Sequence, residues 1–207
     1  MIDFAVLITA FATLFVVIDP IGLAPMFVAL TKGAPAAHRR KVALRACVIA
    51  IVLLTLFGLL GEALLGFVGI STPAFRISGG VLLFLTALDM LFERRTARRK
   101  GQAQTHNDPS VFPLATPLIA GPGSMATMIL LTGQAETPLG IFWMLLVMAA
   151  VVTLAFALFL TANWIERVLG DTGINVVTRL LGMLLAALSV QFVLDGLSSF
   201  GLGSLPG

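Results

Sequence analysis

Long apolar runs recur along the whole chain and constrain its fold more than any other feature. The sequence is 58% hydrophobic and only 11% charged, whereas soluble domains carry roughly 25% charged residues. A transmembrane helix needs about 20 predominantly apolar residues. We therefore expect an all-α membrane protein. Six transmembrane helices are predicted, over residues 4–30, 42–65, 74–91, 111–131, 139–162 and 174–197.

The distribution of lysine and arginine predicts how these helices are oriented. No basic residue precedes the first apolar run, so this run is expected to remain as a helix and not to be cleaved as a signal peptide. The loops after helices one, three and five, with the adjoining helix ends, carry twelve basic residues, and the other side carries only Arg76. Because cytoplasmic loops are enriched in Lys and Arg, both termini are expected outside the cytoplasm. The twelve are Lys32, Arg39, Arg40, Lys41, Arg45, Arg94, Arg95, Arg98, Arg99, Lys100, Arg167 and Arg179.

The sequence also bounds the partners and cofactors. Topology accounts for the basic residues, so we expect them to contact anionic membrane lipid and expect no nucleic-acid partner. The sequence contains no HExxH metal motif, no GxSxG nucleophile motif and no P-loop. An enzyme, a metal site and a cofactor are therefore not expected, and any active transport would draw on an ion gradient, not on ATP. The sequence carries no signal for the oligomeric state.

An internal repeat divides the chain into two halves of three helices. Residues 18–31 align without gaps on residues 119–132. Residues 62–71 align on residues 166–175 at nearly the same offset. Because three is odd, the second half must enter the membrane upside down, as in the inverted repeats of many secondary transporters. We expect a first repeat over 1–92, a basic cytoplasmic linker over 93–110 and a second, inverted repeat over 111–207.

Each half contains a Pro/Gly interruption at the matching position of its first helix. The first reads IDPIGLAP at 18–25, and the second is GPG at 121–123. Helices 1 and 4 are therefore expected to be discontinuous. The second part of each would begin with free N–H groups and a positive dipole end, which suit a carboxylate. Unwound carbonyl groups beside them would suit an ammonium group, so the two breaks predict a site for a small zwitterion.

The predicted substrate-binding residues lie mainly at these two breaks. Ser124 and Thr127 add hydroxyl groups after the second break, and Gln191 lies deeper in the last helix than Asp195. Asp19 is also the candidate for ion coupling, because a carboxylic acid at membrane depth is costly and is by default a functional hypothesis. The full set is Asp19, Pro20, Ile21, Gly22, Ala120, Gly121, Pro122, Gly123, Ser124, Thr127 and Gln191.

Structural roles remain open for the same residues. Asp19 suits a helix N-cap, and a cap is compatible with a ligand contact. The glycines of the second break would also permit close helix packing. The hydroxyl groups of Ser124 and Thr127 can bond to carbonyl groups of their own helix. Asp89, four residues before the basic linker, is expected at the membrane interface beside the first arginines of that linker.

The motifs at the breaks resemble the MarC family, also called the small neutral amino acid transporter family. The resemblance rests on DPIGLAP at 19–25, FRISGG at 75–80 and PLIAGPG at 117–123, with Gln191 and Gly196 in the last helix. It spans nearly the whole chain. The first motif of the family usually begins Asn-Pro, whereas this chain begins it with an aspartate, which adds a titratable group.

The resemblance implies a multi-pass protein of the cytoplasmic (inner) membrane of prokaryotes. Characterised relatives move glycine, alanine and other neutral amino acids, and some are associated with export. We therefore expect a secondary transporter of small neutral amino acids that works by alternating access and is coupled to H⁺ or Na⁺, with export as one direction left open. The alternatives are an exporter of another small metabolite or drug, and a membrane scaffold that transports nothing.

Overall fold

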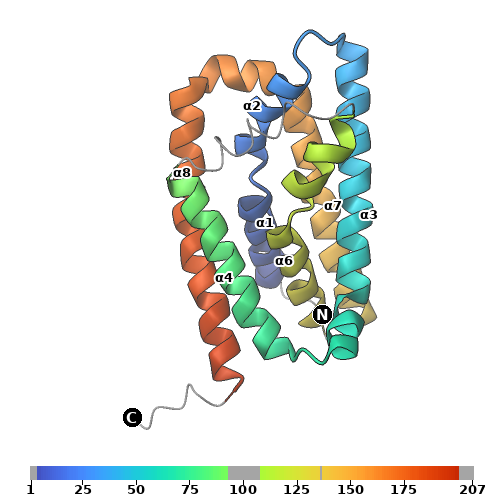
Figure 1. The fold of residues 1–207 in the computed structure, drawn as a ribbon, viewed down its shortest axis with the longest axis vertical. Helices are drawn as coiled ribbons and strands as arrows, with labels where there is room; N and C mark the ends of the chain where they lie inside the picture. Colours follow the sequence, from blue (N-terminus) through green and yellow to red (C-terminus); the bar gives the residue numbers. More distant parts are fainter. Residues whose placement is uncertain (1–3, 93–107, 136, 201–207) are drawn as a thin grey trace.

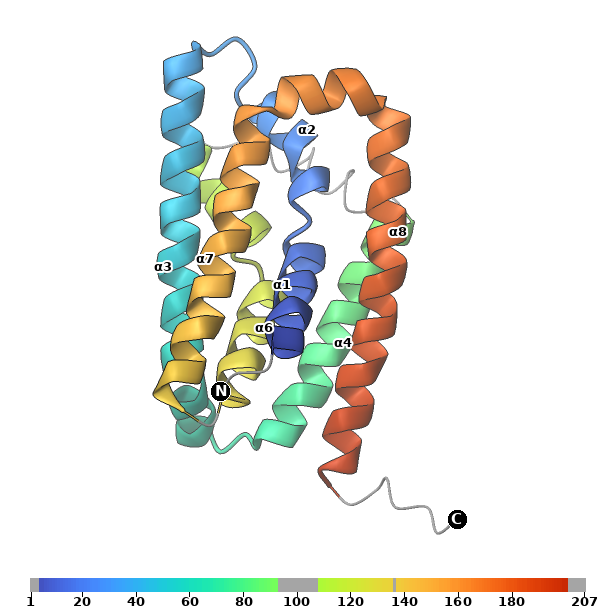
Figure 2. The same cartoon turned by 180° about the vertical axis from the view of Figure 1, so that it is seen from behind.

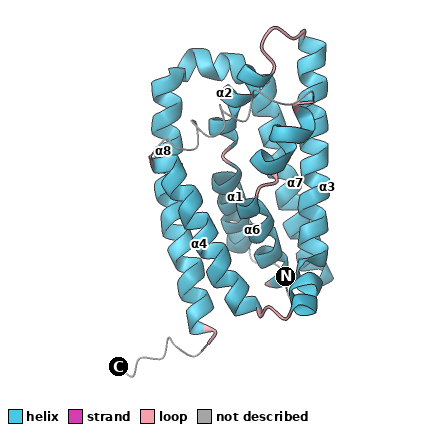
Figure 3. Cartoon of the chain, in the orientation of Figure 1, coloured by secondary structure: helices cyan, strands magenta, loops and turns pink. Residues whose placement is uncertain are grey.

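The computed structural model describes residues 4–92, 108–135 and 137–200, and its regular structure within these ranges is entirely helical (Figure 3). The prediction of an all-α fold is therefore confirmed for the described residues. Most of the predicted linker at 93–110 lies outside the described residues. The elements are α1 (Phe4–Ile18), α2 (Pro20–Leu30), α3 (Ala36–Val68), α4 (Thr72–Leu91), the π-helical η1 (Ser110–Ile119), α6 (Pro122–Gly133), α7 (Pro138–Leu160) and α8 (Ala162–Ser198).

The lengths and apolar character of these helices fit a multi-pass membrane protein. Five spans are long and apolar enough to cross a membrane, with α1 and α2 together forming the first. A sixth results if η1 and α6, which meet at a bend of 55°, are taken as one span. In Figure 1 the chain runs alternately up and down through these passes, so that α1 begins at the end of the molecule where α8 finishes.

The helices surround α1, which lies between the pair α4 and α8 on one side and the pair α3 and α7 on the other in both views (Figures 1 and 2). Glycine lets α4 and α8 approach closely. A Cβ atom on Gly80 would lie 2.7 Å from the carbonyl oxygen of Ser189, and one on Gly196 would lie 3.0 Å from the carbonyl oxygen of Pro73. Small residues at such contacts are the usual means by which membrane helices pack backbone to backbone.

The segment between the last two predicted spans differs from expectation, because residues 163–173 were predicted as a loop and are helical. The first part of α8 runs across the end of the bundle, shown at the top of Figure 2. It turns at Gly170, whose φ of 60° and ψ of 176° are not helical, and the spanning part follows from Thr172. Trp164 in the transverse part is 65% exposed. Tryptophan is enriched at membrane–water interfaces, which fits a helix lying in that plane.

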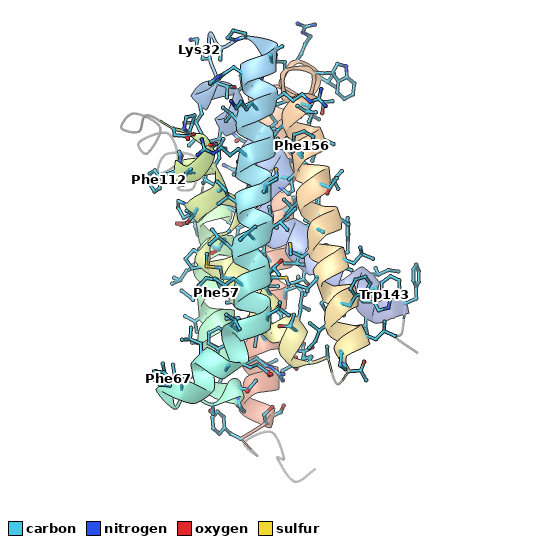
Figure 4. The ribbon with its side chains drawn as sticks, turned by 90° about the vertical axis from the view of Figure 1, so that its right-hand side faces the viewer. Lys32, Phe57, Phe67, Phe112, Trp143 and Phe156 are labelled. Atoms are coloured by element: carbon cyan, nitrogen blue, oxygen red, sulfur yellow. The ribbon has the colours of Figure 1, made fainter. Side chains whose placement is uncertain are left out.

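Apolar side chains cover much of the outside of the bundle. Phe67 is 90% exposed and Val52 is 60% exposed. An apolar exterior of this kind would be a liability in water but is what a surface facing lipid requires. Figure 4 places Lys32 at one end of the bundle, with Phe67 and Trp143 toward the other.

Helices α3 and α6, which come from different halves of the chain, pack closely against each other. The Thr132 hydroxyl oxygen lies 2.7 Å from the Gly58 carbonyl oxygen of α3 and 2.8 Å from the Met128 carbonyl oxygen of its own helix, so its hydrogen is shared between them. Gly61 faces Ile129, and a Cβ atom on Gly61 would overlap that side chain. The two halves of the chain are therefore in close contact at Gly58 and Gly61, because these glycines have no side chain to separate α3 from α6.

We predict that Gly61→Ala destabilises the protein, whereas Gly66→Ala in the same helix does not. The added methyl group at Gly61 must displace Ile129, while a Cβ atom on Gly66 has no atom within 4 Å. Overpacking should cost about 1–3 kcal/mol at Gly61, and removing a helical glycine at Gly66 should be neutral or stabilising by up to about 1 kcal/mol. Thermal unfolding of both variants in detergent tests this. Equal melting temperatures would contradict the described α3–α6 contact.

Candidate functional site

The first helix is interrupted at Asp19. Helix α1 ends at Ile18, and Asp19 adopts the left-handed conformation (φ 53°, ψ 61°), which Asp tolerates better than most residues. Helix α2 then begins at Pro20, where the missing N–H group is no loss. Asp19 is fully buried, and its Oδ1 accepts a hydrogen bond from the Gly22 amide at 3.1 Å. The aspartate therefore caps α2, as its residue type allows.

Gly22 makes this cap sterically feasible. A Cβ atom on Gly22 would lie 2.7 Å from the carboxyl carbon of Asp19 and closer still to one of its oxygens. The backbone on either side stays bonded, because the Asp19 amide donates to the Phe15 carbonyl at 2.9 Å and the Leu23 amide donates to the Asp19 carbonyl at 3.0 Å. The chain thus turns at one residue with most of its backbone groups satisfied, as hydrocarbon surroundings require.

The second interruption lies between η1 and α6. Thr116 and Phe112, each followed by proline, have extended backbone angles within η1, as the residue before proline prefers. Helix α6 starts at Pro122. The Ser124 hydroxyl accepts from the Gly121 amide at 2.9 Å and donates to the Ile119 carbonyl at 2.7 Å. A single serine side chain therefore satisfies backbone groups on both sides of this break.

A cavity of about 120 Å³ lies beside the second break. It is walled by the end of α1, by one face of α4 and by the residues that join η1 to α6. The walls are close together, since a Cβ atom on Gly123 would lie 3.4 Å from Val17 and 3.8 Å from the Thr86 hydroxyl oxygen. The lining residues are Val17, Thr86, Asp89, Pro117, Leu118, Gly121, Pro122, Gly123 and Ser124.

Four of the eleven predicted site residues line this cavity, namely Gly121, Pro122, Gly123 and Ser124. The remaining seven do not line it. Thr127 is fully buried and donates to the Gly123 carbonyl at 2.8 Å, which is the structural role left open for it. The first break contributes Val17 to the cavity in place of the predicted residues. The seven are Asp19, Pro20, Ile21, Gly22, Ala120, Thr127 and Gln191.

Gln191 lies on an exposed face of α8 and not at the cavity. Its side-chain amide donates to Asp195 Oδ1 at 2.7 Å. These two residues are four apart and therefore share one helix face. Depth along the helix suggested Gln191 as a cavity residue, whereas the rotation of α8 about its axis decides which way it faces.

Thr86 and Asp89 are the polar cavity residues that sequence reasoning missed. They are three residues apart on α4 and so lie on the same face. Asp89 was expected beside the arginines of the linker, which lie outside the described residues. The Thr86 hydroxyl donates to the Leu82 carbonyl at 2.9 Å. Within the described ranges, no cluster of three or more His, Cys, Asp or Glu side chains could hold a metal ion.

Contacts between the two halves also gather near the end of the molecule that carries Lys32. The rings of Phe27 in α2 and Phe159 in α7 stack with centroids 5.0 Å apart. Arg39 in α3 lies 5.5 Å over the Phe27 ring and donates to Asn163 Oδ1 in α8 at 3.0 Å. These contacts join α2 and α3 of the first half to α7 and α8 of the second.

An ion pair also joins α3 to the segment that precedes η1. Arg45 in α3 pairs with Asp108, which precedes η1, at 2.5 Å. Hydrogen bonds from Ser110, together with the charge of Arg45, hold the pKa of the Asp108 carboxyl below its ordinary value of 3.8. The pair is partly exposed to solvent, so it adds little to the free energy of unfolding. Its main effect is to hold Asp108 beside α3.

We predict that Gly22→Ala destabilises the protein, because the added methyl group displaces the Asp19 carboxylate from the start of α2. The expected loss is about 1–3 kcal/mol, from overpacking and a broken cap. Asp19→Asn is the matched control, since asparagine also caps helices and tolerates the left-handed conformation. Thermal unfolding should rank wild type and Asp19→Asn together, above Gly22→Ala. A Gly22→Ala protein as stable as wild type would contradict the described cap.

Comparison with known proteins places this architecture in a family. The profile described as "MarC family integral membrane protein" matches residues 4–200. A UPF0056 membrane protein of Aquifex aeolicus is 37% identical over 95% of each chain. In Escherichia coli K12, the UPF0056 membrane protein YhcE is 33% identical over 99% of this chain and 96% of its own, and the UPF0056 inner membrane protein YhgN is 33% identical over 92% and 95%. No solved structure matches. The chain belongs to the MarC family of integral membrane proteins.

Proposed function

We propose that this protein is a secondary transporter of small neutral amino acids, such as glycine and alanine. The observation that carries the proposal is the cavity of about 120 Å³ beside the broken span of η1 and α6. Secondary transporters typically bind their substrates at discontinuous helices. The volume of the cavity equals that of about four water molecules at roughly 30 Å³ each. Pockets for drug-sized ligands have volumes of roughly 300–1,000 Å³. Its size therefore favours a small metabolite over a drug.

The start of α6 supports a carboxylate-bearing substrate. The first intrahelical bond of α6 runs from the Met125 amide to the Gly121 carbonyl at 2.9 Å. The amides of Gly123 and Ser124 precede that bond and therefore have no intrahelical partner. Both residues line the cavity, and the positive end of the helix dipole adds to their attraction for an anionic group.

Alternating access is the mechanism we propose, with the two halves acting as inverted repeats. Two observations support it: the breaks at Asp19 and at 120–121 fall at matching positions of the repeat, and the chain enters them from opposite ends of the bundle (Figure 1). The Phe27–Phe159 stack and the Arg39–Asn163 hydrogen bond join the halves near the Lys32 end. In this mechanism these contacts open when the halves rock about the substrate.

We place the protein in the inner membrane, as the name of its relative YhgN states for that protein. The excess of basic residues on the side of Lys32 and Arg39 supports a cytoplasmic location for that end. Both termini would then be extracytoplasmic, and the exposed apolar surface would contact lipid. We propose no cofactor. Asp19 remains the proposed site of H⁺ or Na⁺ coupling, because it is a fully buried carboxyl group at the first break.

We predict that glycine, alanine or serine raises the melting temperature of the purified protein. A ligand at a hundredfold excess over its Kd adds about 2.7 kcal/mol to stability. Bulky neutral amino acids such as tryptophan should have no effect, because the cavity is too small. The shift should depend on pH or on sodium, and Asp19→Asn should keep the shift but lose that dependence. A protein stabilised by another small metabolite and by no amino acid would favour the alternative substrate. Stabilisation by no solute at all would favour a scaffold.

A further inference from the structure

One carboxylate at the cavity comes from α4 and not from either helix break. Asp89 lies on α4 and lines the cavity together with Thr86, one turn earlier. It is the one acidic side chain among the lining residues. Asp89 lies two residues before the end of α4 and is half-buried, so that its carboxylate is partly withdrawn from solvent.

The α4 wall offers hydrogen-bond acceptors to a ligand. Thr86 gives its hydroxyl hydrogen to the Leu82 carbonyl at 2.9 Å, so that the lone pairs of its oxygen are what it presents to the cavity. An ionised Asp89 is acceptor-only. An ammonium group, with three donors and a positive charge, is the chemical complement of this wall.

The opposite wall has the reverse polarity. It is formed by the start of α6, where the amides of Gly123 and Ser124 have no intrahelical partner. Both walls line the same cavity. A small ligand in this cavity would meet acceptors on one wall and donors on the other. An α-amino acid carries the matching charges on adjacent groups.

We propose that Asp89 binds the α-ammonium group of the transported amino acid, with the Thr86 hydroxyl oxygen beside it. The substrate carboxylate then lies at the start of α6. This inference rests on the proposed function and adds to it a residue and an orientation of the substrate. It also separates two aspartates, because Asp89 lines the cavity and Asp19 does not.

The test compares ligand binding by wild type, Asp89→Asn and Asp195→Asn. Asp195 is a matched control, because it is also an aspartate in a membrane-spanning helix but bonds to Gln191 away from the cavity. Titrations of thermal stability with L-alanine would give the apparent affinity of each protein. We expect Asp89→Asn to lose about 10- to 100-fold in affinity, as for a lost hydrogen bond to a charged group, and Asp195→Asn to stay within about threefold of wild type.

L-Lactate provides a second test that needs no variant. It keeps the carboxylate and methyl group of alanine but replaces the ammonium group with a hydroxyl group. Wild type should bind lactate at least about tenfold more weakly than alanine. If Asp89→Asn does not fold, this comparison still tests whether the site recognises an ammonium group.

Two results would overturn the ammonium site while leaving the proposed function intact. One is unchanged alanine affinity in Asp89→Asn, and the other is equal affinity of wild type for lactate and alanine. Failure of wild type to bind any amino acid would instead remove the proposed substrate class, and the ammonium site with it.

Discussion

The need to satisfy backbone hydrogen bonds in hydrocarbon governs this structure. A helix that breaks inside a membrane exposes amide and carbonyl groups to a medium that offers no partner. One side chain at each break meets part of that need. Asp19 accepts from the Gly22 amide at the first, and Ser124 bonds to both Gly121 and Ile119 at the second. These caps bond part of the backbone at each break, and the amides of Gly123 and Ser124 at the start of α6 remain without an intrahelical partner.

The function we propose follows from what the second break leaves beside it. Helices η1 and α6 meet there at a bend of 55°, and a small cavity remains beside the end of α1 and beside α4. Its surfaces carry backbone amides on one side and Thr86 and Asp89 on the other. Around this space, contacts such as Thr132 with Gly58 join helices from different halves. A substrate site bounded by two halves is what alternating access requires.

The sequence predicted well whatever depends on local chemistry. Apolar runs gave the spans, and the Pro/Gly clusters at 18–25 and 121–123 marked where α2 and α6 begin. It predicted less well what depends on the rotation of one helix against another. Asp89 faces the cavity and Gln191 does not, although both are polar residues in apolar helices. The transverse part of α8 was missed because its residues are too polar for a span, and the sequence alone does not separate an interfacial helix from a loop.

The most direct test of secondary transport is counterflow in proteoliposomes. Vesicles containing the purified protein are loaded with unlabelled alanine and diluted into a trace of labelled alanine. A carrier that alternates between its two sides should accumulate the label transiently, well above vesicles without protein, and loading with tryptophan should give no such accumulation. Uptake equal to that of protein-free vesicles, with any small neutral amino acid on both sides, would contradict transport by this protein.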